Sequence, residues 1–170
     1  MRGDVILSLD LQVHNKNGKL IRRRRQRCNS LLKAFAFVWH SVMRAAYLRD
    51  INDVVMRDTA GAYWTFFKGS TQYFGNAHAG GAPINVDAYG MAVGTGSTGV
   101  TLNDYMLSAK ISHGSGSGQL QYQACAVDPV TIDGQKSEFI YRRAFINGSG
   151  SVINVREVGV VLAMYEIYSN

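Results

Sequence analysis

Glycine is distributed very unevenly along this chain of 170 residues, and its distribution constrains the fold more than any other feature. Residues 1–57 hold 2 of the 18 glycines, and residues 58–170 hold the other 16. In this second part, short apolar runs alternate with Gly- and Ser-rich clusters such as Gly94–Gly99 and Gly114–Gly118. Glycine weakens helix interiors and supplies turn conformations, so the pattern predicts short strands joined by turns.

The second part of the chain therefore predicts a mainly β body. Short strands separated by such turns are typical of an antiparallel sandwich or a partly open barrel. Residues 69–82 are expected to form a loop. Thr101–Leu107 is expected to form one helical turn, with Thr101 as its cap and Asp104 three residues on. Asn147–Ser151 is expected to join its flanking strands as a hairpin. The expected strands are Asp53–Met56, Ala62–Phe67, Ile84–Ala88, Gly90–Val93, Gln119–Val127, Ser137–Ile146, Val152–Val155 and Val158–Ile167.

The first part predicts a β-hairpin followed by a helix. Apolar and polar residues alternate over Val5–Val13, and Asn17-Gly18 is a strong hairpin-turn signal before a returning strand at Leu20–Arg27. Residues 29–48 begin with residues suited to cap a helix and continue with apolar side chains at three-and-four spacing, which predicts one amphipathic α-helix. Its large apolar residues are expected in the core; they include Phe35, Trp39 and Tyr47.

Charge divides the chain at the same place as glycine. Residues 1–57 hold 12 Lys and Arg against 4 Asp and Glu, whereas residues 58–170 hold 6 against 8. We therefore expect a basic hairpin and helix at 1–57, acting as an assembly piece, and a Gly-rich β module at 58–170, together forming one compact domain. The chain has no run of about 18 uncharged apolar residues, so no membrane span is expected. Met1–Leu11 does not read as a signal peptide, which predicts synthesis in a cytoplasm.

The sharpest feature is a run of arginines at residues 22–27, where five guanidinium groups occur in six residues. Strand alternation divides them between two faces, with Arg23, Arg25 and Arg27 on one and Arg22, Arg24 and Gln26 on the other. Three roles are open for this run: contact with nucleic-acid phosphates, an interface with acidic patches on a protein partner, or a solvated edge strand whose charges prevent edge-to-edge pairing. No aromatic residue interrupts the run, which argues against base stacking.

The residue types that usually carry catalysis or bind metals are scattered along the chain. No two histidines have metal-ligand spacing, and neither cysteine has a second Cys or His within four residues. The loop Gly94–Gly99 lacks the Lys-Ser/Thr pair of a phosphate-binding loop. We therefore expect no catalytic residue, no metal and no cofactor, and no activity that depends on these histidines and cysteines. They are His14, His40, His78, His113, Cys28 and Cys125.

Three segments of the second part resemble structural proteins of tailed bacteriophages, namely tail, fibre and neck components. The segments are Met91–Thr98 with its Gly-Thr-Gly turn, Asn103–Leu107 with an Asp-x-x-Leu pattern, and Phe145–Gly159, which ends in Glu-x-Gly. The resemblance covers about residues 90–165 and leaves the N-terminal hairpin and helix unplaced. It implies a non-enzymatic β module that works as a symmetric homo-oligomer.

The resemblance predicts a structural component of a phage tail, neck or connector, made in the host cytoplasm and located in the virion. Its expected partners are copies of itself and other virion proteins. One alternative is a capsid or decoration protein whose basic segment contacts packaged nucleic acid, and another is a receptor- or glycan-binding module.

Two adjacent charges, Arg156 and Glu157, lie on an otherwise apolar strand of the expected module. A buried charge is costly unless it is paired. Either Arg142 or Arg143 pairs with Glu157 across the expected hairpin, or both charges of the Arg156-Glu157 pair face solvent at a sheet edge.

Overall fold

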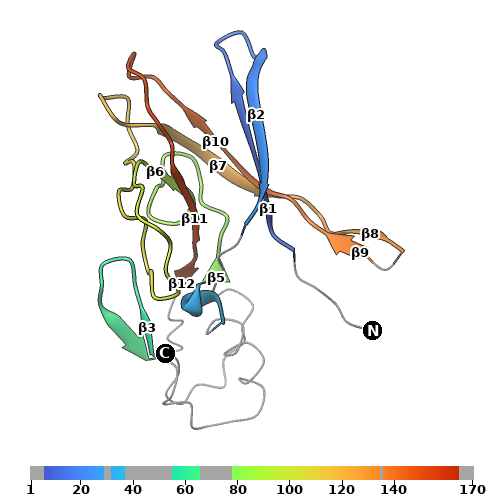
Figure 1. Cartoon of the computed structure of the whole chain (residues 1–170), viewed down its shortest axis with the longest axis vertical. Helices are drawn as coiled ribbons and strands as arrows, with labels where there is room; N and C mark the ends of the chain where they lie inside the picture. Colours follow the sequence, from blue (N-terminus) through green and yellow to red (C-terminus); the bar gives the residue numbers. More distant parts are fainter. Residues whose placement is uncertain (1–5, 29–31, 37–54, 66–77, 135, 165–170) are drawn as a thin grey trace, which may run out of the picture.

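The computed structural model describes residues 6–28, 32–36, 55–65, 78–134 and 136–164 (Figure 1). Strands dominate these residues, and only 33–36 among them are helical, so the prediction of a mainly β chain is confirmed. The strands are β1 (Ser8–His14), β2 (Leu20–Arg27), β3 (Val55–Arg57), β4 (Tyr63–Thr65), β5 (His78–Ala79), β6 (Gly90–Gly94), β7 (Gln121–Val127), β8 (Thr131–Asp133), β9 (Lys136–Glu138), β10 (Tyr141–Ile146), β11 (Glu157–Val161) and β12 (Ala163–Met164).

The described strands form six antiparallel pairs, each of which is a two-stranded sheet. Four of these pairs join strands close in sequence: β1 with β2, β3 with β4, β7 with β10, and β8 with β9. The other two, β6 with β11 and β5 with β12, bring the C-terminal part of the chain back onto its middle. Those two long-range pairs close the body of the molecule (Figure 1).

The core lies between β6, β7 and the segments that lead into β7 and β11. Tyr122 is its largest fully buried side chain; the Tyr122 hydroxyl donates to the Ile111 carbonyl at 2.6 Å, and the ring meets Phe145 edge-on at 4.9 Å between centroids. Such an edge-to-face pair stabilises the fold beyond the burial of the two rings. The buried cluster comprises Ala92, Val93, Ile111, Leu120 and Tyr122, against which Leu107, Phe145, Ile153, Val155 and Val158 pack.

The N-terminal hairpin forms as predicted. Strands β1 and β2 pair from Ser8 with Arg27 to Val13 with Arg22, and a register shift follows before the turn. The Asn15 side chain accepts hydrogen bonds from the amides of Asn17 and Lys19, both at 3.0 Å. Of the two residues of the turn signal, only Gly18 has a positive φ, of 77°. The turn therefore needs one left-handed residue, and Asn15 closes it through its side chain.

A second hairpin extends from the body as a continuation of β7 and β10. The amide of Asp128 donates to the Ile140 carbonyl at 2.8 Å, so the short pair β8–β9 follows directly on the pair β7–β10. The expected strand Ser137–Ile146 is accordingly split into β9 and β10, and the sequence analysis missed β8. Strand β5 was not expected either, since its residues lie in the predicted loop at 69–82. In Figure 1 the pair β8–β9 points away from the body, as β1–β2 does in another direction.

The expected strand Ile84–Ala88 is wrong, because this segment forms a turn. Asn85 has a φ of 68°, a left-handed conformation that Asn tolerates better than most residues. The carbonyls of Pro83 and Val86 accept hydrogen bonds from the Arg143 side chain. These carbonyls therefore accept hydrogen bonds from a buried cation and not from a neighbouring strand.

The expected strand Val152–Val155 and the hairpin around Asn147–Ser151 are also wrong. Strand β10 pairs with β7, whereas β11 pairs with β6, so residues 147–151 connect two different sheets. Beyond Gly94 the chain that would pair with 152–155 turns away, because the amide of Thr95 donates to the Ala109 carbonyl at 2.9 Å. Ile153 and Val155 nevertheless pack against the core.

Most of the helix expected at residues 29–48 lies outside the described residues; of those described, 33–36 are helical. Phe35 was expected in the core but is 46% exposed. At the predicted cap, Asp104 accepts hydrogen bonds from the amide and hydroxyl of Thr101, at 2.9 and 2.6 Å. Those contacts close a turn rather than a helix, since residues 101–107 contain none.

Candidate assembly surface

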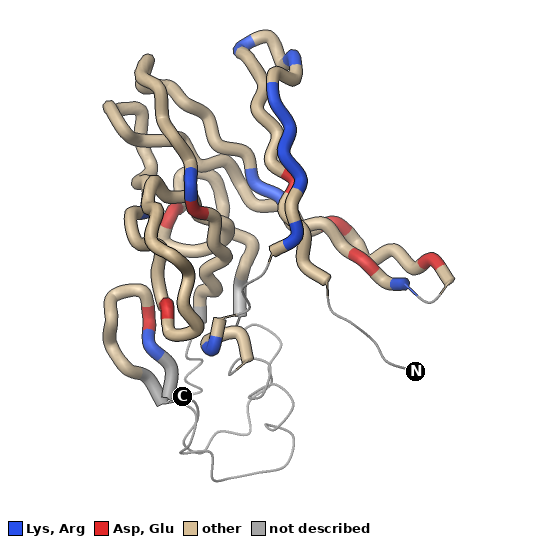
Figure 2. Tube along the Cα trace, in the orientation of Figure 1, with Lys and Arg blue, Asp and Glu red and all other residues tan. Residues whose placement is uncertain are grey.

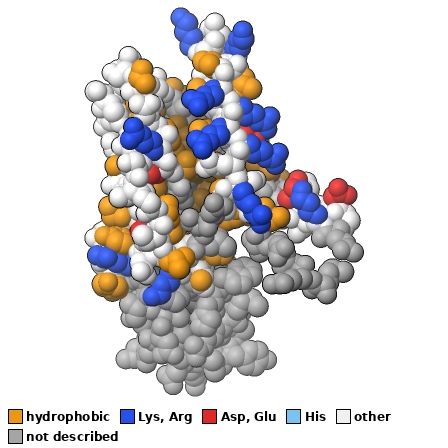
Figure 3. Space-filling view, viewed as in Figure 1, with side chains coloured by type: hydrophobic (Ala, Val, Ile, Leu, Met, Phe, Trp, Pro, Cys, Tyr) orange, Lys and Arg blue, Asp and Glu red, His pale blue; other side chains and the backbone are white. Residues whose placement is uncertain are grey.

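The hairpin of β1 and β2, residues 8–27, is here called the basic arm. It holds seven Lys and Arg against one acid, Asp10, so its net charge of +6 equals the formal net charge of the whole chain. All residues of the two strands are exposed except Leu9, which is half-buried. Lys and Arg follow β2 along its length in Figure 2, and their side chains cover the arm in the space-filling view of Figure 3. The charge of the protein is therefore concentrated on a projecting ribbon.

One arginine of the run has a partner inside the arm. Arg23 Nε donates to both carboxylate oxygens of Asp10, at 2.9 and 3.1 Å, and Arg23 Nη2 adds a third contact. This two-pronged pair lowers the pKa of Asp10 and raises that of Arg23. The pair links β1 to β2. No described residue forms an ion pair with the other arginines of the run, Arg22, Arg24, Arg25 and Arg27.

The two faces of the arm differ, as strand alternation predicted. The register places Leu9, Leu11 and Val13 on the same face as Gln26, Arg24 and Arg22. At the root of the arm this face borders a shallow groove, lined by Leu9, Leu11 and Arg24 on one side and by Val155, Arg156 and Val158 on the other. Toward its tip the apolar side chains have no such cover: Val13 is 43% exposed and Leu20 is 45% exposed.

The second projecting hairpin, residues 127–140 with β8 and β9, is here called the tip hairpin. Its charges are two Asp, one Glu and one Lys, a net charge of −2. Lys136 and Glu138 pair with each other, and Asp128 pairs with Arg142 at 2.6 Å. Its apolar residues are strongly exposed: Val127, Val130, Ile132, Phe139 and Ile140. Sequence reasoning missed this surface because it placed Val127, Phe139 and Ile140 in two ordinary strands and expected no strand at 128–136.

Of the two predicted structural charges, Glu157 is half-buried and Arg156 is exposed. Glu157 pairs with neither Arg142 nor Arg143. Its carboxylate accepts hydrogen bonds from the amide and hydroxyl of Ser108, at 2.8 and 2.9 Å, and from the amide of Ala109 at 3.1 Å. Burial by itself raises the pKa of Glu157, but these hydrogen bonds outweigh it and hold the pKa below its usual value. Glu157 therefore fastens the loop before β7 to β11.

Arg143, like Arg142, was an expected partner for Glu157 but instead joins several elements of the body. It is 9% exposed, and its guanidinium stands 4.7 Å from the centre of the Tyr122 ring. Nε donates to the Gln123 carbonyl at 2.7 Å, Nη1 to the carbonyls of Tyr89 and Met91 at 3.2 and 3.0 Å, and Nη2 to those of Pro83, at 3.3 Å, and Val86. Five backbone carbonyls thus meet the five donors of one guanidinium.

Those candidate catalytic residues whose side chains the structure describes are not assembled into a site. His113 Nδ1 accepts a hydrogen bond from the Tyr122 amide at 3.2 Å, which commits this histidine to the core. Cys28 is exposed, and the half-buried Cys125 lies 3.1 Å from the Tyr141 hydroxyl. His14 ends β1 in the exposed arm, and His40 lies outside the described residues. Among the described residues, no three His, Cys, Asp or Glu side chains cluster as metal ligands would.

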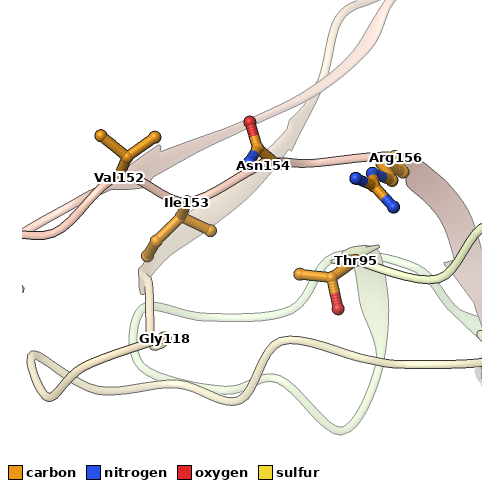
Figure 4. A pocket seen from close by; sticks show the side chains of 6 residues that line it. All are labelled: Thr95, Gly118, Val152, Ile153, Asn154 and Arg156. Atoms are coloured by element: carbon orange, nitrogen blue, oxygen red, sulfur yellow. The ribbon is translucent and has the colours of Figure 1, made fainter.

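A shallow hollow of about 370 Å³ lies beside residues 152–156 (Figure 4). Its lining mixes apolar and polar side chains, and Arg156 supplies its one charge. The residues are Thr95, Gly118, Val152, Ile153, Asn154 and Arg156. The lining holds no carboxylate, His or Cys that would serve as an acid, base or nucleophile. The loop Gly94–Gly99 contributes only Thr95.

Among the described residues, the structural features that bear on function are the charged and the apolar surfaces. Comparison of the chain with protein-family models, with curated proteins and with solved structures finds no match. In the part of the chain described here, no helix combines the length and apolarity needed to cross a membrane. The surfaces that stand out are the basic arm and the tip hairpin, both of which suit contact with a macromolecule.

Proposed function

We propose that this chain is a non-enzymatic structural subunit that assembles with copies of itself in a phage tail, neck or connector. The observation that carries the proposal is the pair of hairpins that project from the body with uncovered apolar side chains. An isolated two-stranded hairpin is marginally stable in water, and exposed apolar patches usually mark interaction sites. Neighbouring subunits that cover the hairpins account for both features. The phage setting rests on the resemblance over residues 90–165.

The antiparallel sandwich or partly open barrel belongs to the same proposal. The two-stranded sheets of the basic arm and of the tip hairpin offer strand edges that pair with no other described strand, and such edges are templates for pairing with another chain. In an assembly, strands of one copy extend the sheets of the next and complete the β layers.

Static light scattering of the purified chain over a hundredfold range of concentration tests the proposal. We expect a mass that is a constant multiple of 18.7 kDa, the mass of one chain. A mass of 18.7 kDa at every concentration contradicts it.

Nucleic-acid binding is the second candidate, and the unpaired arginines of the exposed arm favour it. Arginines that contact phosphates make binding fall steeply as salt rises. The variant Arg22→Gln, Arg24→Gln, Arg25→Gln and Arg27→Gln removes these charges and keeps Arg23, whose pair with Asp10 supports the arm. DNA binding is measured by retention on filters at two salt concentrations, and assembly by light scattering. For a structural subunit we expect the variant to lose more of its assembly than of its DNA retention. If the variant still assembles but no longer retains DNA, and retention by the wild type falls steeply with salt, the capsid or decoration protein is favoured instead.

A further inference from the structure

We infer that the basic arm of one copy packs against the tip hairpin of the next copy, apolar side chain against apolar side chain, with opposite charges at the edges of the contact. The inference rests on the proposed assembly and names the two surfaces that meet in it. The partner that covers the arm, and the one that covers the tip hairpin, is thus another copy of this chain.

The first step is that neither surface is covered within one chain. Val13 and Leu20 of the arm are 43% and 45% exposed, and Ile132 and Phe139 of the tip hairpin are 78% and 62% exposed. Side chains that packed against each other in the same chain would not keep this much accessible surface. A contact between these apolar side chains of the arm and the tip hairpin is therefore a contact between two chains.

The second step is that charge selects the tip hairpin over another arm. The arm carries a net charge of +6 and the tip hairpin a net charge of −2. Figure 2 shows the separation, with Lys and Arg along β2 and mainly Asp and Glu at β8–β9. Arm against arm brings like charges together, whereas arm against tip hairpin brings together two surfaces of opposite net charge. Such complementarity steers association and suppresses wrong pairings.

The third step concerns symmetry. The two surfaces lie on different parts of the chain, so a contact between them is heterologous, head to tail. Each copy then offers its arm to one neighbour and its tip hairpin to the other. Repetition of this contact gives a ring when the rotation closes and a filament when it does not.

Two single variants test the apolar contact. Val13→Glu alters the arm, Ile132→Glu alters the tip hairpin, and both sites are exposed, so folding is expected to persist and is checked by circular dichroism. We expect the mass from light scattering to fall to 18.7 kDa for each. The matched control is Val100→Glu, the same change at a residue 65% exposed in the loop after β6, and it should assemble as the wild type does.

An exchange of charges tests which surfaces meet. One variant carries Lys19→Glu, Arg22→Glu, Arg24→Glu and Arg27→Glu, which give the arm a net charge of −2, and the other carries Asp133→Lys and Glu138→Lys, which give the tip hairpin a net charge of +2. Arg25 is left in place because it already acts within the chain: after the larger effect of Lys136, it helps to lower the pKa of Glu138. Each variant alone should be a monomer, since like charges then face each other. An equimolar mixture should regain assembly, because each arm again meets a tip hairpin of opposite charge.

The outcomes separate this inference from the proposal beneath it. A wild-type chain that is monomeric at every concentration overturns both. An assembled wild type whose mass survives Val13→Glu or Ile132→Glu overturns only the contact between arm and tip hairpin, as does a mixture of the charge variants that stays monomeric. A third outcome is that the arm charge variant assembles as the wild type does but no longer retains DNA on filters at low salt. This outcome also overturns the contact and assigns the arm to nucleic acid.

Discussion

Replacement of Arg143 by lysine should destabilise the body of the molecule severely, although it keeps the positive charge. The guanidinium of Arg143 on β10 holds carbonyls of β6, of β7 and of the turn at residues 83–86, which are 20 to 60 residues away in sequence. A lysine ammonium has three donors on one nitrogen, and a guanidinium has five in a planar fork. At least two of the five carbonyls therefore lose their partner in Arg143→Lys.

The magnitude follows from the cost of a buried acceptor without a hydrogen bond, which is about 1–3 kcal/mol for each group. Two such groups give a loss of about 2–6 kcal/mol in the free energy of unfolding. Loss of the flat contact with the Tyr122 ring adds to this, because an ammonium is compact and more strongly hydrated. A small domain is typically stable by about 5–15 kcal/mol, so the predicted loss is a large part of the total.

Urea unfolding followed by circular dichroism, at one fixed protein concentration, measures this loss. The matched control is Arg142→Lys, the same substitution at the neighbouring position of β10. Arg142 is exposed and pairs with Asp128 at 2.6 Å, so its replacement should change the free energy of unfolding by less than about 1 kcal/mol. Equal unfolding midpoints for the two variants would refute the argument that the five carbonyls depend on the Arg143 guanidinium.

Two further predictions concern Glu157 and the loop that it holds. Because its pKa is lowered in the folded chain, Glu157 contributes stability above about pH 4.5, and that contribution is lost as the pH falls further. In urea unfolding at pH 7, Glu157→Gln should lose about 2–3 kcal/mol, and the gap to wild type should narrow below pH 4; a gap independent of pH would contradict this. Gly96→Ala should also destabilise the chain, since an added Cβ would lie 1.8 Å from both Glu157 Oε1 and Ser108 Oγ. Gly99→Ala, where a Cβ meets nothing within 4 Å, is the control, and equal melting temperatures for the two would contradict the clash.

The parts of the fold that could be predicted from sequence are those set by neighbours along the chain. The basic arm is the clearest case, because alternation defines its faces and Asn17-Gly18 marks its turn. Even there, the closing hydrogen bonds come from Asn15, two residues before the signal. The contacts of Thr101 with Asp104 were also predictable, because the spacing of three residues brings the two side chains together.

The parts that could not be predicted depend on contacts between distant residues. Arg143 follows Arg142 in sequence and is identical to it, yet one is buried among carbonyls and the other is exposed. No local pattern distinguishes them, since the acceptors of Arg143 lie up to 60 residues away. The same buried cation explains why the apolar segment Ile84–Ala88 is a turn. Likewise, the partners of Glu157 come from a loop 48 and 49 residues earlier, which a search for a nearby arginine does not find.

The arginines of this chain illustrate two opposite uses of the same side chain. In the body, one guanidinium is surrounded by neutral carbonyls that were placed by β6, β7 and a turn, so its burial makes the packing of those elements interdependent. In the arm, a run of guanidinium groups stands in water with one carboxylate, Asp10, among them. Their mutual repulsion adds nothing to the stability of a free hairpin, which is marginal by itself. Because the charge opposes the isolated ribbon but favours its docking on an acidic surface, we expect the arm to hold a neighbour rather than to stabilise its own chain.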